Sequence, residues 1–272
     1  MGEIVSFMLA PFVATLLVLA IHVYLGLHVI QREIIFVDLA LAQIAALGTT
    51  VALILGIHPE QSLSYLFSLG FVVFGAGLFS VTRVREQRIP QEAVIGITYA
   101  VATAAAVLVA DRAPGGAEHI KETLTGAILW IHWPMIGKIA ILYALVGILH
   151  FLFRNRFTDL TGKYRTGELS RTDRWWDFLF YLTFGLVIVL SVRVAGILLV
   201  FSFLVVPTST AMLVADSWIG RLLWGWALGL VVTVLGLYLS YVLDMPSGPT
   251  IVVLLGLFLA GFSLARSAGA SG

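Results

Sequence analysis

Long apolar runs dominate this chain, and their length decides what it can fold into. A helix needs about 20 mostly apolar residues to cross a bilayer. Nine stretches approach that length: residues 8–30, 34–56, 62–82, 92–110, 134–153, 177–192, 196–215, 220–242 and 249–265. Strands of a membrane barrel would alternate apolar and polar residues, whereas these runs are apolar on all sides. The sequence therefore predicts an all-α, polytopic membrane helical bundle.

The number of crossings is eight or nine. The stretches at 177–192 and 196–215 are short and are joined only by residues 193–195. If both cross the membrane there are nine transmembrane helices, and if one of them is re-entrant there are eight. No segment outside the runs is long enough to fold separately, so we expect residues 1–272 to form a single transmembrane domain.

Composition excludes several classes of protein. Charged residues make up 11% of the chain, against about 25% in ordinary soluble domains. So few charges cannot coat a soluble enzyme, a disordered protein or a nucleic-acid binder. The absence of cysteine rules out disulfides and thiolate metal sites. Neither a His-Glu-x-x-His nor a Gly-x-Ser-x-Gly motif occurs, which argues against an intramembrane enzyme.

The basic residues predict the orientation, because Lys and Arg concentrate on the cytoplasmic side of a membrane. Four of the 16 lie on one side, namely Arg112, Lys121, Lys138 and Arg193. The other 12 fall in the alternate loops: Arg32, Arg83, Arg85, Arg88, Arg154, Arg156, Lys163, Arg165, Arg171, Arg174, Arg221 and Arg266. With nine crossings, this bias places the N-terminus outside and the C-terminus in the cytoplasm.

Residues 154–174 form the only long polar segment, and six of the basic residues lie in it. Two interpretations are open. The segment is either a solvated loop on the positive side of the membrane or a docking surface for a cytoplasmic partner.

Asp38 is the clearest ionisable residue at membrane depth, and such residues are costly and often functional. Gln43 follows in the same apolar run. At 100° per residue the two are about 140° apart, so they do not share one helix face. Asp38 either lies in a substrate pathway or caps or pairs near the interface, with Arg32 as the candidate partner. Gln43 either lies in the pathway or makes an interhelical hydrogen bond.

Two proline sites interrupt the apolar pattern near the C-terminus. Pro207 is expected to break its helix, and Thr208, Ser209 and Thr210 follow it and can satisfy the freed backbone groups. Broken helices often mark the binding region of transporters. The second site, 244–249, either places Asp244 at the outside mouth of a pathway or is an ordinary loop.

Several of these segments together resemble the permease subunits of ABC transporters for zinc, manganese and iron ions, the ABC-3 family. The match runs in order over about residues 20–264. The matching pieces, in chain order, are REIIFVDLALAQIAALG at 32–48, EAVIGITY at 92–99, APGG at 113–116, VAGILLVFSFLVVPTSTA at 194–211 and DMPSGPTIVVLLG at 244–256.

The resemblance implies a permease in a bacterial-type plasma membrane that imports a divalent metal ion and is not itself an enzyme. It implies two cytoplasmic ATPase subunits that use ATP, an extracytoplasmic substrate-binding protein and a second permease copy, expected as a homodimer. Residues 154–174 would then hold the coupling helix that docks on the ATPase. The positions expected to couple are Asp159, Gly162, Arg165 and Arg171.

The chain departs from the family in its second helix. Family members usually carry an aspartate there and a histidine four residues later, which form the metal site. Counted back from Gly48, these positions are Leu39 and Gln43. The candidate metal ligands are therefore Asp38 and Gln43, and a π-bulge would be needed to bring Asp38 to the pathway face. This departure keeps open a permease for a chelated metal or another small solute, and a secondary transporter without an ATPase.

Overall fold

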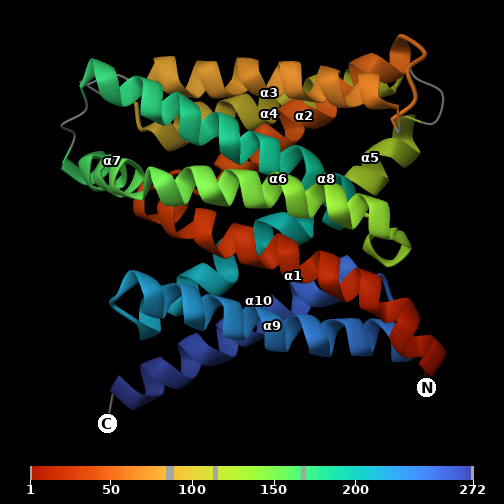
Figure 1. Ribbon diagram of the computed structural model, residues 1–272, viewed down its shortest axis with the longest axis vertical. Helices are drawn as coiled ribbons and strands as arrows, with labels where there is room; N and C mark the ends of the chain where they lie inside the picture. The colour runs from red at the N-terminus through yellow and green to blue at the C-terminus, as the bar shows by residue number, and fades with distance from the viewer. Residues whose placement is uncertain (1, 60, 84–88, 113–115, 167–169, 271–272) are drawn as a thin grey trace. The chain divides into compact units, whose positions relative to one another are not determined.

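The computed structural model describes residues 2–59, 61–83, 89–112, 116–166 and 170–270. Every regular element in these ranges is a helix (Figure 1), which confirms the all-α prediction. The elements are α1 Gly2–Gln31, α2 Val37–Ile54, α3 Ser62–Thr82, α4 Gln91–Ala110, α5 Gly116–Thr125, the 3₁₀ turn η1 Ile128–Trp130, α6 Trp133–Leu152, α7 Arg154–Thr166, α8 Arg171–Val214, α9 Trp218–Val242 and α10 Ser247–Ala270. Arg85, Arg88, residues 113–115 and residues 167–169 lie outside the described ranges.

Eight of the described helices are long and apolar enough to cross a membrane. The apolar part of α8 covers 43 residues, Thr172–Val214. At 1.5 Å per residue it would extend about 65 Å, roughly twice the hydrocarbon thickness of a bilayer. Its backbone is not helical at Gly196, where φ is 75° and ψ is 158°. The two parts, 171–195 and 197–214, are each of spanning length, which favours the nine-crossing alternative.

The break in α8 is at Gly196, so the expectation that Pro207 breaks this helix is wrong. The helix continues through Pro207 to Val214. Proline removes one backbone N–H, but a buried membrane helix tolerates this loss when its neighbours satisfy the freed groups. At Gly196 only glycine adopts the observed backbone angles without strain. Ala127 donates its backbone N–H to the Val194 carbonyl oxygen there, at 3.2 Å.

The chain packs as two units that are interleaved along the sequence. Unit 2 comprises residues 28–124 and 141–193, and it contains the end of α1, helices α2 to α5, most of α6, α7 and the first part of α8. Within it α2 packs against both α3 and α4. The hydroxyls of Thr49 on α2 and Ser68 on α3 hydrogen-bond to each other at 2.5 Å. Polar side chains thus join apolar helices at a buried contact.

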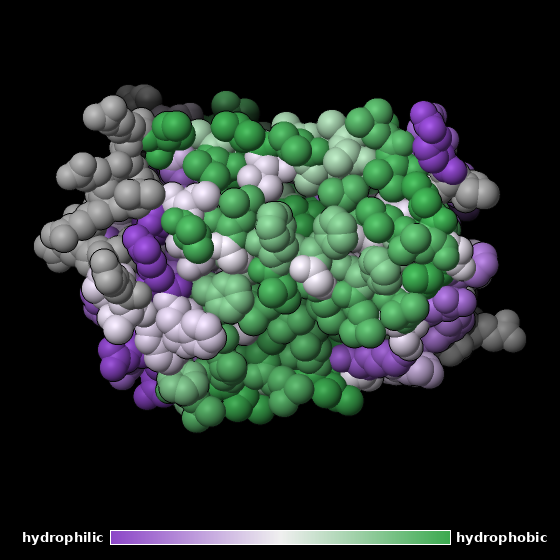
Figure 2. All heavy atoms as spheres, turned by 90° about the horizontal axis from the view of Figure 1, so that it is seen from above, coloured by the Kyte–Doolittle hydropathy of each residue, from purple (hydrophilic) through white to green (hydrophobic). Residues whose placement is uncertain are grey.

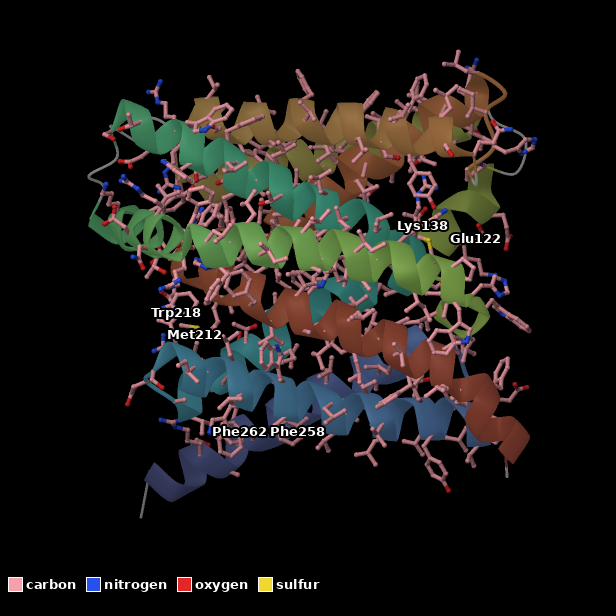
Figure 3. The ribbon with its side chains drawn as sticks, in the orientation of Figure 1. Glu122, Lys138, Met212, Trp218, Phe258 and Phe262 are labelled. Carbon is pink, nitrogen blue, oxygen red and sulfur yellow. The ribbon has the colours of Figure 1, made fainter. Side chains whose placement is uncertain are left out.

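Unit 1 comprises residues 1–27, 125–140 and 194–272, with most of α1, the second part of α8, and α9 packed on α10. The Gly2 end of α1 and the Ala270 end of α10 lie at opposite ends of this unit (Figure 1). Phe258 and Phe262 lie one turn apart on α10 (Figure 3), and their rings stack with centroids 6.4 Å apart. They line an apolar cavity of about 220 Å³ with residues of α8 and α9.

The surfaces of the long helices suit a lipid environment. In Figure 2 the visible face is apolar across its middle and carries hydrophilic side chains toward its two ends. Large apolar side chains of unit 2, among them Phe74, Val81 and Leu108, are exposed to the surroundings. Exposed apolar bands of this kind occur where a protein contacts lipid rather than water. The molecule is therefore a multi-pass membrane protein.

Candidate coupling site and substrate pathway

Helix α7 occupies the polar segment from which the sequence predicted either a solvated loop or a docking surface. Phe157, Leu160 and Thr161 are buried, and Tyr164 is half-buried. Their spacing of three and four residues puts them on one face of the helix. The opposite face is exposed and includes Asp159 and Gly162. Helix α7 is thus amphipathic, with one face packed on the other helices of unit 2 and the opposite face exposed.

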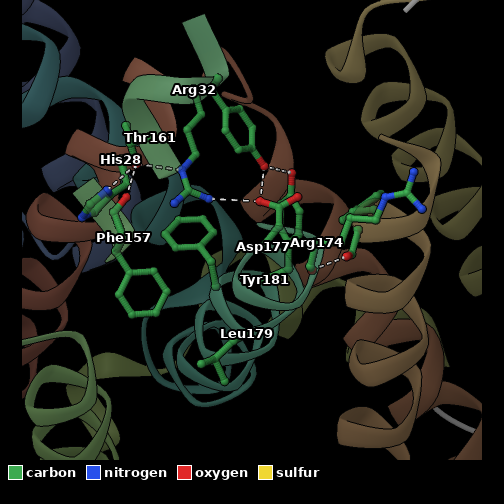
Figure 4. A network of polar contacts seen from close by, with 12 residues as sticks. His28, Arg32, Phe157, Thr161, Arg174, Asp177, Leu179 and Tyr181 are labelled. Carbon is green, nitrogen blue, oxygen red and sulfur yellow. Dashed lines mark hydrogen bonds and ion pairs between the residues drawn. The ribbon is translucent and has the colours of Figure 1, made fainter. Parts of the chain in front are cut away.

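Arg32, which directly follows α1, is at the centre of the polar contacts that hold α7 (Figure 4). Its Nε donates to Thr161 Oγ1 at 3.0 Å, and its Nη1 donates to Asp177 Oδ1 at 3.3 Å. Thr161 Oγ1 also lies 2.8 Å from His28 Nδ1. One guanidinium therefore joins the end of α1, the middle of α7 and the second turn of α8.

Asp177 forms the other half of this network. The side chains of Arg32 and Asp177 are only 0% and 3% exposed. The Tyr164 hydroxyl donates to the same Asp177 Oδ1 and lies 3.3 Å from the Tyr181 hydroxyl. The Arg32 guanidinium also lies 3.7 Å from the centroid of the Phe180 ring. The buried ion pair is thereby supported by hydrogen bonds and by a cation–π contact, although Asp177 Oδ2 has no hydrogen-bond partner among the described residues.

Arg83, directly after α3, is a second cation at this site. Its guanidinium lies over the ring of Tyr164. Partial burial lowers the pKa of the Arg83 guanidinium to about 10. The group still carries its charge at neutral pH, so two arginines face the single carboxylate of Asp177.

Aromatic and ionic contacts hold the rest of α7. The ring of Phe157 stacks on that of His150, with centroids 4.1 Å apart and planes at 10°. Lys163 Nζ lies 3.1 Å from Asp159 Oδ2 and 3.3 Å from Asp173 Oδ1. Hydrogen bonds to Asp159 and then to Asp173 raise the pKa of Lys163. The second of these bonds ties α7 to the first turn of α8.

Sequence reasoning missed Asp177, Thr161 and Tyr164, and it assigned Arg32 to the wrong candidate partner. Arg32 pairs with Asp177, 145 positions away, and no ion pair to Asp38 is formed among the described residues. Asp177 carries the same signal that singled out Asp38, an acidic residue at the start of an apolar run. Of the four expected coupling residues, Asp159 and Gly162 lie on the exposed face of α7, while the side chains of Arg165 and Arg171 lie outside the described part of the structure.

Asp38 and Gln43 are both buried in α2, with 1% and 7% of their surfaces exposed. Asp38 Oδ1 accepts the backbone N–H of Leu39 at 2.7 Å, whereas its Oδ2 has no hydrogen-bond partner among the described residues. No residue of α2 adopts a π-helical pattern. The bulge that would bring Asp38 and Gln43 to one face is therefore not present in this helix.

Glu92, at the start of α4, lies against the same end of α2. Its Oε1 accepts the backbone N–H of Phe36 at 3.0 Å, which satisfies one of the free amides that precede α2. Its Oε2 has no partner among the described residues. The sequence marked this residue only as part of a family-like stretch.

The other expected pathway residues belong to unit 1. Thr208 is fully buried and its hydroxyl donates to the Val23 carbonyl oxygen of α1 at 3.4 Å. A Cβ added at Gly26 would stand 2.5 Å from the Thr208 hydroxyl, so α1 and α8 approach closely here because position 26 is glycine. Pro207 is buried and Ser209 is half-buried. Thr208 thus makes a helix–helix contact.

Asp244 lies in the short connection between α9 and α10, exposed, with a positive φ of 53°. Ser240 and Ser247, which flank it, hydrogen-bond through their hydroxyls at 2.6 Å and close the connection. No group of three or more His, Asp or Glu side chains placed to bind a metal ion occurs in the part of the chain that the structure describes.

Comparisons with known proteins agree with this architecture. The chain is 26% identical over 249 residues to the manganese import system permease protein ScaB of Streptococcus gordonii, covering 88% of this chain and 84% of that protein. It is 29% identical over 216 residues to the manganese transport system membrane protein MntB of Synechocystis, covering 75% and 67%.

A solved structure, PsaBC from Streptococcus pneumoniae in complex with Fab, superposes with a TM-score of 0.75 at 19% identity, over 93% of this chain and 90% of that chain. That likeness shows the fold. The family match shows more, because residues 4–265 match the ABC 3 transport family. Since the match covers nearly the whole chain, the protein belongs to the ABC 3 transport family.

Proposed function

We propose that this chain is the membrane-spanning subunit of an ATP-driven importer of a divalent metal ion. The observation that carries the proposal is the family match over residues 4–265. Manganese is the first ion to test, because the two relatives compared above are named for manganese. Iron and zinc are the alternatives. The chain itself hydrolyses nothing, and a partner ATPase uses the ATP.

The metal passes Asp38 and Gln43 in unit 2, and Pro207, Thr208, Ser209 and Asp244 in unit 1. Asp38 is buried and its Oδ2 has no hydrogen-bond partner in the part of the chain that the structure describes, which supports a role in binding a cation. Oxygen ligands such as carboxylates and amides suit Mn²⁺ better than they suit Zn²⁺, for which imidazole and thiolate compete well. The donor set of this chain therefore favours manganese over zinc.

The partners follow from the same family. Two ATPase subunits bind the segment 154–174 through Asp159, Gly162, Arg165 and Arg171, and an extracytoplasmic binding protein delivers the ion to a homodimer of this chain. The N-terminus lies outside and the C-terminus in the cytoplasm of a bacterial-type plasma membrane. The opposite positions of the two chain ends in unit 1 support an odd number of crossings.

The test is metal uptake into proteoliposomes that contain the chain, its ATPase and its binding protein. We expect ATP-dependent accumulation of Mn²⁺, and none with an ATPase that cannot hydrolyse ATP. Asp38→Ala should reduce uptake, while Asp38→Glu should retain part of it. Hydrolysis of ATP without uptake of manganese, iron or zinc would contradict the metal proposal.

Docking of the ATPase has a separate test. Charge reversal at Arg165 and Arg171 should reduce the amount of ATPase that co-purifies with the permease, whereas Arg112→Glu at the other predicted side should not. Unchanged co-purification of the double variant would exclude these two arginines from the ATPase interface.

A second candidate is an ABC permease for a chelated metal or another small solute. The presence of Leu39 and Gln43 where the family usually carries aspartate and histidine favours it, and so does the regular α-helical geometry of α2. In that case Asp38→Ala and Gln43→Ala would leave transport unchanged, and the purified complex would carry no stoichiometric free metal ion. Sensitivity to both substitutions would favour the metal permease.

A further inference from the structure

Helix α7 is tied to α6 by the backbone, because Phe153 between them donates its N–H to the Leu149 carbonyl oxygen and accepts the N–H of Phe157. Its contacts with α8 and the α1–α2 turn, in contrast, are made by side chains. On its N-terminal side it follows α6 after Phe153, and on its C-terminal side residues 167–170 separate it from α8. Its outer face is exposed, and its inner face is buried through Phe157, Leu160 and Thr161. A force applied to the outer face therefore reaches α8 and the α1–α2 turn through the contacts of the inner face.

We propose that Arg32, Thr161, Tyr164 and Asp177 form a joint that makes α7 move as one body with the α1–α2 turn and the start of α8, and so transmits ATPase motion to the membrane helices. These four residues are called the α7 joint below. The inference rests on the proposed function, because it presumes an ATPase on α7. The four are positioning residues that act on the transport cycle without touching the transported ion.

The geometry makes the α7 joint stiff. The planar guanidinium of Arg32 presents fixed donors, and it uses Nε for Thr161 at 3.0 Å and Nη1 for Asp177 at 3.3 Å. The ring of Phe180 lies 3.7 Å from the centre of the guanidinium. Tyr164 adds a second bond from α7 to Asp177 Oδ1. Sliding of α7 along α8 would break several of these contacts at once.

The burial of the α7 joint separates it from an ordinary surface ion pair. The side chains of Arg32 and Asp177 are 0% and 3% exposed, so water cannot replace either partner when they separate. A buried ion pair adds little net stability compared with an apolar pair of the same size, and its best attested use is to fix one register. Fixing the register of α7 against α8 is what the transmission of motion requires.

The test measures ions moved per ATP hydrolysed in the reconstituted complex, for wild type, Arg32→Gln and Asp177→Asn. We expect the ratio to fall by about tenfold, which is the factor that corresponds to the lower end of the free energy of a hydrogen bond to a charged group, while ATPase co-purification stays near wild type. Arg32→Lys should recover part of the ratio, because a lysine still pairs with Asp177. A ratio within about twofold of wild type in both variants would overturn the proposal.

If Arg32→Gln or Asp177→Asn fails to assemble with the ATPase, Thr161→Val and Tyr164→Phe decide the question, because they keep the ion pair. Each should lower the ratio by a smaller factor, and an unchanged ratio in both would overturn the proposal. Failure of the proposed function looks different, since the wild-type complex itself would then move no metal.

A readout that needs no transported ion completes the test. The chain has no cysteine, so spin labels can be placed at Arg156 on the outer face of α7 and at Trp175 on α8, which are both exposed. In the wild type we expect the same label distance with the ATPase free of nucleotide and trapped with ATP. In Asp177→Asn we expect the distance to shift or broaden on trapping. A shift in the wild type would show that α7 moves independently of α8 and would overturn the proposal.

Discussion

The part of α8 in unit 2 is held by an arginine near each end, and the two contacts are built differently. Near its start, Asp177 receives Arg32 in a buried ion pair. Near its end, Arg193 donates to the Pro59 carbonyl oxygen at 2.5 Å and to Ser64 Oγ at 3.3 Å, with its guanidinium 3.6 Å from the centroid of the Tyr65 ring. The first contact pairs two charges, whereas the second places one charge on neutral acceptors.

The two arginine contacts differ in chemistry, and they also differ in which part of the structure they hold. Arg193 fixes α8 to Pro59 in the connection between α2 and α3 and to Ser64 in the first turn of α3. Arg32 and Asp177 hold α7, a separate polar helix with an exposed outer face. A charge on neutral acceptors is sufficient to anchor α8 to its neighbours. The contact with α7, the helix that we propose receives force from an ATPase, is instead a paired and buried charge.

The largest effect is expected at the first contact. Asp177→Ala leaves Arg32 buried without its counter-ion, and breaking a buried pair in this way costs about 3–5 kcal/mol. Thermal unfolding in detergent, followed by tryptophan fluorescence, should show a large fall in midpoint. The midpoint of Asp177→Asn should fall less, because asparagine keeps an acceptor oxygen. A midpoint unchanged in the alanine variant would show that the ion pair is dispensable.

The second contact should prove weaker. Arg193→Gln removes a charged donor from the Pro59 carbonyl oxygen, and hydrogen bonds to charged groups contribute about 1.5–3 kcal/mol. The same thermal unfolding measurement should give a smaller fall than Asp177→Ala, and Arg193→Lys should be milder still. If the unfolding midpoint of Arg193→Gln fell as far as that of Asp177→Ala, or further, the two ends of this part of α8 would not differ in strength.

A third test concerns the break in α8 at Gly196, three residues after Arg193. Gly196→Ala forces an L-residue into a backbone region that essentially only glycine occupies, at a cost of about 1–3 kcal/mol. Pro207→Ala, in contrast, should be tolerated or slightly stabilising, because the helix is continuous through that position. If Pro207→Ala were the more damaging of the two, the placement of the break at Gly196 would be wrong. Unfolding midpoints of the two variants, measured side by side, give the answer.

The smallest expected effect is a dependence of protein stability on alkaline pH, which arises from Lys163 on α7. The pKa of Lys163 is raised by Asp159 and Asp173, so the folded state binds its proton more tightly than the unfolded state. The stabilisation is therefore complete below the ordinary lysine pKa of about 10.4 and is lost as pH rises through the higher folded-state value. Wild-type unfolding midpoints should decline more steeply above about pH 10 than those of Lys163→Gln. Parallel declines would show that the contacts of Lys163 with Asp159 and Asp173 contribute nothing measurable to stability.

The helices could be predicted from sequence because membrane spans depend on local apolar length, and each of the nine predicted runs coincides with a helix, or with one part of α8, to within a few residues at its ends. The position of the break in α8 could not be predicted in this way. Proline is a local signal for a break, but whether Pro207 breaks α8 depends on its buried surroundings. The break at Gly196 depends on Ala127, far along the chain, which satisfies the Val194 carbonyl oxygen.

The contacts of α7 show the same limit. Residues 154–174 could be predicted as a polar segment with a candidate docking role, since polar residues are scarce elsewhere in the chain. The partner of Arg32 could not be predicted, because Asp38 is near in sequence whereas Asp177 is brought close only by packing. Local patterns reveal which residues are costly to bury, and tertiary structure determines with which groups they pair.

The most direct measurement compares the two ends of α8 in one transport experiment. Arg32→Gln and Arg193→Gln remove the same guanidinium and insert the same amide, so they form a matched pair. The number of ions taken up per ATP hydrolysed should fall by about tenfold in Arg32→Gln and stay near wild type in Arg193→Gln. Equal ratios in the two variants, whether both low or both normal, would contradict the account in which one end transmits motion and the other only anchors the helix.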